Sequence, residues 1–543
     1  MTDLILVCQS NVMNVEETSN WPLDRLETFD TLVYPRLVYH GDRFVTHLDL
    51  INQAIGRKSY DASSFAERRG LMNIWHLPSM SGVHLANFLL GHGISVKLIN
   101  NLDSEWDLFE AAYSACSQPP LVGISSTFYL GAKQVGRIAK RLLKLDPAME
   151  IVVGGAWANS VADSEGMGRV ETVMRKYGIS HLLHAFNPEA DLCELIKARK
   201  GTRDFSAINN LCTMDGSQFV ANSVKWNEPL LDEAPALWDR LDLPFVNRTL
   251  QIRTASGCPF SCAFCSYPTT ARGWKTLDVD AVRAHLNAVK RIPGIEQLIF
   301  IDDTFNVPQQ RFKELLKVFR EYDFEWFSFL RVQYVDEEIV GLMKKSGCAG
   351  VYLGIESASD KILQNMNKKA TKADFARGLA LLDKYGIPSL SAFVLGFPGE
   401  TEETLEENMR FIEENPVPFY SLKEFFYMEN TKVHRERDQW GLTGMGAKWA
   451  HATMNSDAAG RHKLEMFKRI TASRFVDPDT SLWYMAYLRD QGLSDGAIAT
   501  IQEELTGIMR RQLGGDFSPD HGAVERIAAA ARTSAQLRGA AGG

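Results

Sequence analysis

The sequence predicts an α/β protein with a Rossmann-like open sheet, a partial (β/α)6 barrel and a mostly helical C-terminal region. Strand and helix patterns alternate over residues 1–205, which indicates the sheet domain, with an insertion near its N-terminus. After a polar, proline-punctuated linker at 206–246, short strands recur through 247–432, as they do in a barrel. Residues 433–543 have a mostly helical pattern and end in an Ala/Gly-rich tail that we expect to be disordered.

The composition is that of an ordinary globular protein, with 45% apolar and 23% charged residues among 543. A formal net charge of −8 disfavours a nucleic-acid partner. No apolar run reaches about 18 residues, so we expect no membrane span. The N-terminus lacks the basic region of a signal peptide, and the scattered cysteines fit free thiols in a reducing cytoplasm. The scattered cysteines are Cys8, Cys116, Cys193, Cys212 and Cys348.

In the first domain the strands are short apolar runs separated by helical patterns. Gly82–Leu90 has apolar residues at helical spacing and is ended by Gly91 and Gly93. A helix with a basic outer face is expected at Lys133–Leu145. Residues from about 10 to 70 have weak periodicity, and we assign them only to an insertion or cover. The expected strands are Asp3–Cys8, Ile94–Ile99, Pro120–Ile124 and Glu150–Val153.

Hydroxyl residues and glycines stand where two of these strands end. In an open parallel sheet the ligand lies beyond the carboxyl ends of the strands, so these residues are candidates for ligand binding. Taken singly, each also fits an ordinary turn. The candidates are Ser125, Ser126, Thr127, Gly154 and Gly155.

Three cysteines, Cys258, Cys262 and Cys265, follow the strand at Leu250–Arg253 with C-x3-C-x2-C spacing. Thiolates on a loop are soft ligands that suit an iron–sulfur cluster or zinc. A structural zinc site normally needs a fourth ligand nearby, and the following residues offer no second C-x2-C pair or H-x3-5-H. Three ligands without a fourth leave one metal position open for chemistry.

After the cysteines, strands alternate with helices and end in polar residues or glycine. Thr401, for example, caps a helix with Glu402 and Glu403 in its first turn. Six strands instead of eight predict a partial barrel with its site at the carboxyl ends of the strands. The five strands after Leu250–Arg253 are Gln297–Ile301, Trp326–Leu330, Gly350–Ile355, Ser389–Leu395 and Phe419–Phe426.

Several polar residues at these strand ends are candidates for the site. Glu356 lies on the strand face opposite to Val351 and Leu353, so we expect it to point into the lumen, where a cofactor or an ion pair would satisfy it. Asp302, with its neighbour Asp303, suits either a cofactor pocket or acid–base chemistry. Arg331 is expected either to face a carboxylate or to lie on the surface.

The cysteine spacing, with an aromatic residue before the third cysteine, resembles the radical S-adenosylmethionine (SAM) superfamily. Gly354-Ile-Glu-Ser357 and Gly396-Phe-Pro-Gly-Glu-Thr401 resemble two further signatures of its larger members. The resemblance implies that Cys258, Cys262 and Cys265 bind a 4Fe-4S cluster. The residues that it assigns to SAM are Phe264, Asp302, Arg331, Glu356, Ser357, Gly396 and Phe397.

The preceding sheet resembles the cobalamin-binding domain of cobalamin-dependent radical SAM enzymes. That resemblance assigns the five hydroxyl and glycine candidates to cobalamin, although the D-x-H-x-x-G motif that would supply a lower cobalt ligand is absent. The domain order and Lys448–Asn455 are similar to the P-methyltransferase branch of phosphinothricin tripeptide biosynthesis. In that segment Trp449 and His451 would either cover a substrate or form a core pair.

The family resemblance implies a mechanism and partners. An electron from the cluster releases a 5′-deoxyadenosyl radical from SAM, and methylcobalamin donates a methyl group to an unactivated carbon or a phosphinate phosphorus of an antibiotic precursor. The implied partners are a small-molecule substrate, free or carrier-bound, and an electron donor such as flavodoxin or ferredoxin. The alternatives are a cobalamin-containing radical SAM oxidoreductase or cyclase without methyl transfer, and a non-enzymatic zinc-binding protein.

Overall fold

The structure is a computed structural model, and its described residues fall into several ranges. These are 2–11, 37–57, 71–129, 131–231, 241, 248–476 and 481–539. Much of the predicted insertion lies outside the described residues, as do most of the linker residues after 231 and the end of the tail at 540–543. In the described part of the chain, none of the helices combines the length and apolarity needed to cross a membrane.

The first domain is built on a seven-stranded sheet in the order β4-β1-β5-β6-β7-β8-β9. β4, β1, β5, β6 and β7 are parallel, as the alternating pattern predicts. The strands are β1 (Leu4–Gln9), β4 (Val96–Asn101), β5 (Leu121–Ser125), β6 (Ile151–Gly154), β7 (His181–Leu183), β8 (Leu211–Asp215) and β9 (Gln218–Ala221). The helices are α4 (Met80–Gly91), α5 (Trp106–Ser114), α6 (Ala132–Leu145), α7 (Ala156–Ser164), α8 (Met167–Tyr177) and α9 (Glu189–Lys200).

The predicted linker contains a hairpin, β8 and β9, that pairs antiparallel with the end of this sheet. Leu182 pairs with Cys212, so the first domain continues beyond residue 205 as far as β9. Cys212 is buried, whereas every residue of β9 is at least partly exposed. The outer strand of a sheet has only one strand partner and is partly exposed, so its residues can be polar. The sequence of β9 therefore resembles that of a connecting segment.

The second domain is a partial barrel of six parallel strands, with a short seventh strand at its edge. The six strands are those predicted. They are β10 (Thr249–Ile252), β13 (Gln297–Phe300), β14 (Glu325–Leu330), β15 (Cys348–Glu356), β16 (Ser389–Leu395) and β17 (Phe419–Glu424), and the seventh is β21 (Arg474–Phe475). The helices between them are α11 (Val279–Lys290), α12 (Gln309–Phe319), α13 (Glu337–Lys345), α14 (Asp360–Asn365), α15 (Lys372–Lys384) and α16 (Glu402–Glu414).

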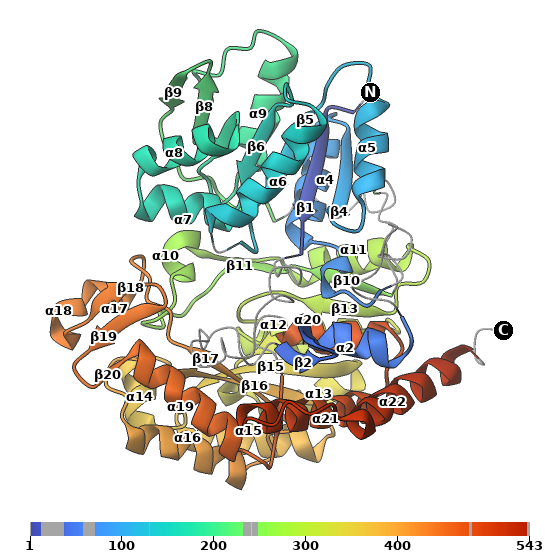
Figure 1. The fold of residues 1–543 in the computed structure, drawn as a ribbon, viewed down its shortest axis with the longest axis vertical. Coiled ribbons are helices and arrows are strands. Elements are labelled where there is room, and N and C mark those ends of the chain that lie inside the picture. The colour runs from blue at the N-terminus through green and yellow to red at the C-terminus, as the bar shows by residue number, and fades with distance from the viewer. Residues whose placement is uncertain are drawn as a thin grey trace.

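Smaller elements stand at the carboxyl ends of the barrel strands. The cysteine loop lies between β11 (Ala255–Gly257) and α10 (Tyr267–Ala271), and β11 pairs with β12 (Trp274–Thr276). After β17 come α17 (Lys432–Arg435) and α18 (Arg437–Trp440), then a sheet of β18 (Thr443–Met445), β19 (Lys448–His451) and β20 (Met454–Asn455), and then α19 (Ser456–Arg469). In Figure 1, α10 and β11 lie between the first sheet and the barrel.

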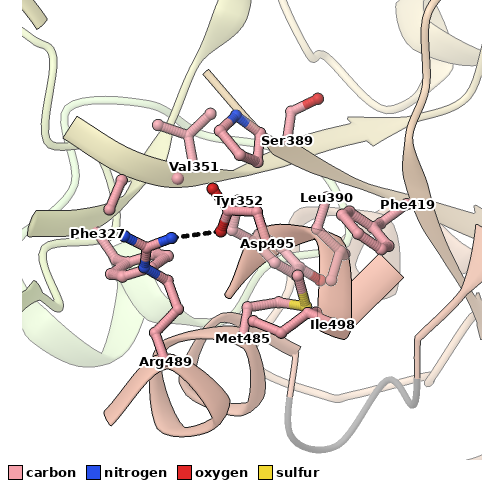
Figure 2. Close-up of a pocket in the computed structure, with 13 residues that line it drawn as sticks. Phe327, Val351, Tyr352, Ser389, Leu390, Phe419, Met485, Arg489, Asp495 and Ile498 are labelled. Atoms are coloured by element: carbon pink, nitrogen blue, oxygen red, sulfur yellow. Dashed lines mark hydrogen bonds and ion pairs between the residues drawn. The ribbon is translucent and has the colours of Figure 1, made fainter. Parts of the chain in front are cut away.

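The C-terminal helices close the opposite end of the barrel. α20 (Ser481–Asp490) lies against β10, β13, β14 and β15, and Gln297 donates a hydrogen bond to the Ala486 carbonyl. Figure 2 shows Met485, Arg489 and Ile498 beneath the lumen-facing Phe327 and Tyr352. Only a small void of about 20 Å³ remains there, so this end of the barrel is a closed floor.

The tail is more ordered than the sequence predicts. α22 (His521–Gly539) packs on α21 (Asp495–Leu513) and on α2 (His47–Ala54), with Ile527 and Ala531 buried. The Ala-rich segment that we expected to be disordered is therefore helical as far as Gly539, in keeping with the high helix propensity of alanine. The hairpin of β2 (Leu37–His40) and β3 (Arg43–Thr46) also covers α21, through hydrogen bonds between the Tyr39 backbone and Gln512.

Candidate active site between the sheet and the barrel

A cavity of about 480 Å³ lies between the carboxyl edge of the first sheet and the mouth of the barrel. We call it the central cavity. Its walls come from both domains, since Gly154 and Glu189 belong to the first domain and Arg253 and Asp303 to the second. Its volume is in the range of cofactor and ligand sites, and the carboxyl ends of parallel strands are where such sites form.

Four of the five predicted residues of the first domain line the central cavity: Ser125, Thr127, Gly154 and Gly155. Gly155 has a φ of +106°, and a Cβ there would lie 3.0 Å from the Thr127 amide nitrogen. The two loops therefore approach each other with no room for a side chain at this point.

Ser126 is the exception among these five, because it is fully buried and faces away from the cavity. Its hydroxyl donates to the Gly154 carbonyl at 2.7 Å and accepts from the Ala158 amide at 3.2 Å. Ser126 thus ties the β5 loop to the start of α7. The side chains before and after it remain free to line the cavity, since neighbours in an extended segment alternate in direction.

The wall supplied by the barrel contains residues that the sequence did not single out, namely Arg253, Tyr267 and Phe329. Asp303 lies beside them, and burial together with the neighbouring Asp302 raises its pKa to about 6. Tyr267 accepts a hydrogen bond from the Gly257 amide, so it is tied to the start of the cysteine loop. A signal for Arg253 was present, because it directly follows a strand whose end meets the site.

Buried polar atoms without a hydrogen-bond partner in the described structure line the same cavity. They include Asn159 Oδ1, Glu189 Oε2 and Arg253 Nη2. The other Glu189 oxygen lies 3.3 Å from His84 Nε2, and the pKa of Glu189 is lowered by His84 and Arg253 against the opposing effect of burial. Such atoms are costly to bury unpaired, so each needs a water molecule or a polar group of a ligand as its partner.

The cysteine loop lies next to this cavity. Cys262 is buried and its Sγ accepts a hydrogen bond from Arg331 Nη2 at 3.0 Å, while Cys258 Sγ lies 3.3 Å from the Thr304 hydroxyl. Burial raises the pKa of Cys265 to about 12. Among the described residues no three Cys, His, Asp or Glu side chains converge in a ready metal-binding arrangement. The three cysteines lie on one loop, and the charges of Cys262 and Cys258 add to the effect of burial on Cys265, so the three thiols are close enough to interact.

A chain of polar contacts connects this loop to Glu356. Arg331 is buried, and it also donates to the Lys368 carbonyl and lies over the Phe260 ring. The Lys368 ammonium in turn lies 2.9 Å from Glu356, whose φ is +64°. Arg331 is therefore no surface arginine. Glu356 forms the ion pair that was one of its two expected roles.

Two of the residues assigned to SAM form hydrogen bonds to other residues of the protein. Asp302 accepts from the Thr254 and Ala255 amides and from the Thr254 hydroxyl, which holds the turn before the cysteine loop. Ser357 is buried and donates to Asn408. Their part in SAM binding remains a prediction.

The Gly396 turn is packed from both sides. Phe397 is buried against the ring of Phe264, at 6.3 Å between ring centres. His451 contacts the Gly396 carbonyl at 3.0 Å and stacks on Trp449, whose indole donates to the Phe425 carbonyl. Trp449 and His451 thus form the core pair that was one of their two expected roles.

Comparison with known proteins agrees with this architecture. Residues 252–412 match the model of the radical SAM superfamily. An uncharacterised methyltransferase of Pyrococcus horikoshii is 33% identical over 171 residues, which are 31% of this chain and 37% of that protein. An anaerobic magnesium-protoporphyrin IX monomethyl ester cyclase of Rubrivivax gelatinosus is 29% identical over 180 residues, or 32% of each chain. The chain thus spans about a third of the length of these relatives.

Two solved structures share the fold over nearly the whole chain. The radical SAM methyltransferase TsrM of Kitasatospora setae, solved with cobalamin and a [4Fe-4S] cluster, has a TM-score of 0.57 at 15% identity, covering 95% of this chain and 100% of that one. The cobalamin-dependent radical SAM enzyme OxsB, solved with aqua-cobalamin and SAM, has a TM-score of 0.57 at 14% identity, covering 98% and 83%. Residues 252–412 are therefore a radical SAM domain, set in a fold that this chain shares with cobalamin-dependent radical SAM enzymes.

Proposed function

We propose that this chain is a cobalamin-dependent radical SAM methyltransferase. Its substrate would be a small precursor of a specialised metabolite such as an antibiotic, free or carrier-bound, methylated at an unactivated carbon or a phosphinate phosphorus. The observation that carries the proposal is the central cavity, because it joins the carboxyl edge of the first sheet to the barrel mouth beside the cysteine loop. An electron donor such as flavodoxin or ferredoxin would be a partner.

The residues present fit the cofactors that this activity needs. Cys258, Cys262 and Cys265 are the soft donors of an iron–sulfur cluster, and Arg331 donates a hydrogen bond to the Cys262 sulfur. The unpaired Glu189 oxygen and Arg253 nitrogen offer an acceptor and a donor, as the amide groups around a corrin require. When bound, these groups would supply one-electron chemistry and a methyl donor.

The chain's own residues would position the reactants and exclude water. Phe264 and Phe397 pack together on the barrel side, and Phe329 covers the lumen beneath the central cavity. Glu356, held by Lys368, would orient the hydroxyl or amino groups of SAM. Ser125, Thr127, Gly154 and Gly155 would form the corrin-facing wall.

Anaerobic purification with metal analysis and an absorption spectrum tests the proposal. We expect about four irons per chain and a corrin band. With SAM that carries a labelled methyl group, label should remain on the protein-bound corrin after gel filtration. A Cys262→Ala variant should lose iron, whereas Cys348→Ala, at a buried cysteine of β15, should retain it. A colourless protein with one zinc and no iron would overturn the proposal.

A second candidate is a radical SAM oxidoreductase or cyclase that also holds a corrin but transfers no methyl group. The cyclase among the sequence relatives favours it. If this second candidate is right, SAM will be cleaved in the presence of substrate, while no label reaches the corrin or the product. The labelled-methyl experiment therefore separates the two candidates.

A further inference from the structure

A second cavity, of about 360 Å³, opens beside the central cavity, and we call it the entrance cleft. Its walls come from α7, from the segment 224–227 after β9, and from α10 behind the cysteine loop. Asn159 and Phe186 line both cavities. Phe186 also packs edge-on against Tyr267 of the central cavity, at 5.8 Å between ring centres. The entrance cleft therefore shares a wall with the proposed reaction site.

Two cationic side chains, Lys225 and Arg272, line the entrance cleft. In the described part of the chain, neither forms an ion pair with a carboxylate. The acidic side chain in the lining, Asp163, is already taken up by His184 at 2.7 Å. The lining thus carries excess positive charge, which in a concave site attracts an anion.

The remaining lining shows what kind of molecule could carry that anion. Trp226 and Val224 expose 38% and 56% of their surface beside the two cations. Exposed apolar side chains next to unpaired charges suit a ligand with an apolar part and an acidic group. His184 Nδ1 and Asn159 Oδ1 are buried in the same walls without hydrogen-bond partners in the described structure.

We propose that the entrance cleft is an oxyanion-binding site, in which Lys225 and Arg272 hold a carboxylate, phosphate or phosphinate group beside Trp226. The inference deepens the proposed function, on which its role in the reaction rests. Two molecules could supply the oxyanion. One is an organic acid serving as the substrate, with its reacting end in the central cavity. The other is the phosphodiester of a bound cobalamin.

Fluorescence quenching of the full chain tests the site. Iodide is the anionic probe, acrylamide is the neutral quencher, and the difference between wild type and Trp226→Phe isolates Trp226. We expect iodide quenching of Trp226 to fall several-fold in the double variant K225Q/R272Q, with acrylamide quenching unchanged. The matched control K361Q/R320Q removes one Lys and one Arg from the outer surface of the barrel and should have no effect. Millimolar inorganic phosphate should displace iodide at constant ionic strength.

Equal iodide quenching in wild type and the double variant would overturn the site, as would phosphate acting no differently from chloride. The source of the oxyanion is identified by loading the protein with cobalamin or with cobinamide, which lacks the phosphodiester. If the phosphodiester of cobalamin occupies the cleft, only cobalamin will abolish phosphate competition. If the cleft serves the substrate, phosphate will still displace iodide from protein loaded with either cobalamin or cobinamide.

This test remains informative if the proposed function fails. A protein that takes up neither iron nor corrin would contradict the methyltransferase proposal, but quenching by iodide and its reversal by phosphate would still report on the cleft. Conversely, a protein that binds iron and corrin, but whose Trp226 fluorescence responds to neither iodide nor phosphate, would contradict only the oxyanion site.

Discussion

At the scale of single residues, Gly396 shows how the barrel mouth is packed. Its φ is +86°, and a Cβ there would lie 2.4 Å from the Trp449 ring. The family resemblance predicts that this glycine lies at the SAM site. Within the protein, its lack of a side chain lets the β19 segment close over the turn.

Replacing Gly396 with alanine should therefore destabilise the fold strongly. We expect a loss of roughly 3 kcal/mol or more, because a left-handed backbone and a steric clash both oppose the new side chain. The matched control is Gly386→Ala, whose φ is +59° but whose Cβ would meet only the end of the Lys344 side chain at 3.9 Å. Thermal unfolding should show a small shift for the control, and equal shifts would contradict the role of Trp449.

Glu400 gives a residue-scale prediction that depends on pH. Burial raises its pKa to about 8, while hydrogen bonds from the Gly396 turn oppose that rise. Because the folded-state pKa lies above the unfolded value, protonated Glu400 contributes stability that is fully present below about pH 4 and is lost as the pH rises through about 8.

Glu400→Gln should therefore gain stability relative to wild type as the pH is raised from 6 to 9, since glutamine carries no charge to bury. Thermal midpoints of both proteins across this range provide the measurement. Glu414→Gln, at the exposed end of α16, is the control and should show no such trend. A difference between E400Q and wild type that stays constant with pH would contradict the prediction.

At the scale of elements, α20 has a role that its sequence did not reveal. Its residues Tyr487 and Leu488 are buried, and Arg489 pairs with Glu325 of β14 at 2.6 Å. The helix closes the barrel at the amino ends of the strands. The open mouth at the other end faces the first domain.

Leu488→Ala should lower the free energy of unfolding by about 2 to 5 kcal/mol, because it leaves a cavity under the barrel floor. The matched control is Leu145→Ala, because Leu145 is the last residue of α6 and is 37% exposed. This substitution should lower the free energy of unfolding far less. Circular dichroism during thermal unfolding measures both. If the two variants unfolded alike, α20 would be a peripheral cover instead of a floor.

At the scale of the whole molecule, the site depends on how the two domains face each other. Gln251 of β10 donates a hydrogen bond to the Pro78 carbonyl of the first domain at 2.7 Å. Burial raises the pKa of Glu189, but the hydrogen bond and charge of His84 lower it by more, and the charge of Arg253, two residues on from Gln251, adds to that lowering across the same boundary. The boundary is thus held together by contacts at the rim of the central cavity.

Arg253→Met should reduce corrin affinity by at least roughly tenfold, because it removes a buried donor while preserving much of the side-chain volume. Iron content should not change, since Arg253 is not one of the proposed ligands. Arg320→Met, on the outer surface of the barrel, is the control. Titration with cobalamin followed by absorption spectroscopy gives the affinities. Unchanged affinity would show that Arg253 does not face the corrin.

Local patterns in the sequence determined the parallel strands of both domains, the helices between them and the three cysteines on one loop. These features follow from side-chain periodicity and residue spacing, which act over a few neighbouring residues. The same patterns predicted that Ser125, Thr127, Gly154 and Gly155 stand where strands end. They could not show that Ser126 turns inward or that Glu356 pairs with Lys368, because those contacts join residues far apart or on opposite faces.

Only the tertiary structure decided which strand ends share a cavity. Arg253 and Glu189 meet because the barrel mouth faces the carboxyl edge of the first sheet. Lys225 and Arg272 line one cleft because the segment after β9 returns to the cysteine loop. The physical reason is that a site between two domains depends on their relative placement, which burial of their facing surfaces determines and no local sequence pattern records.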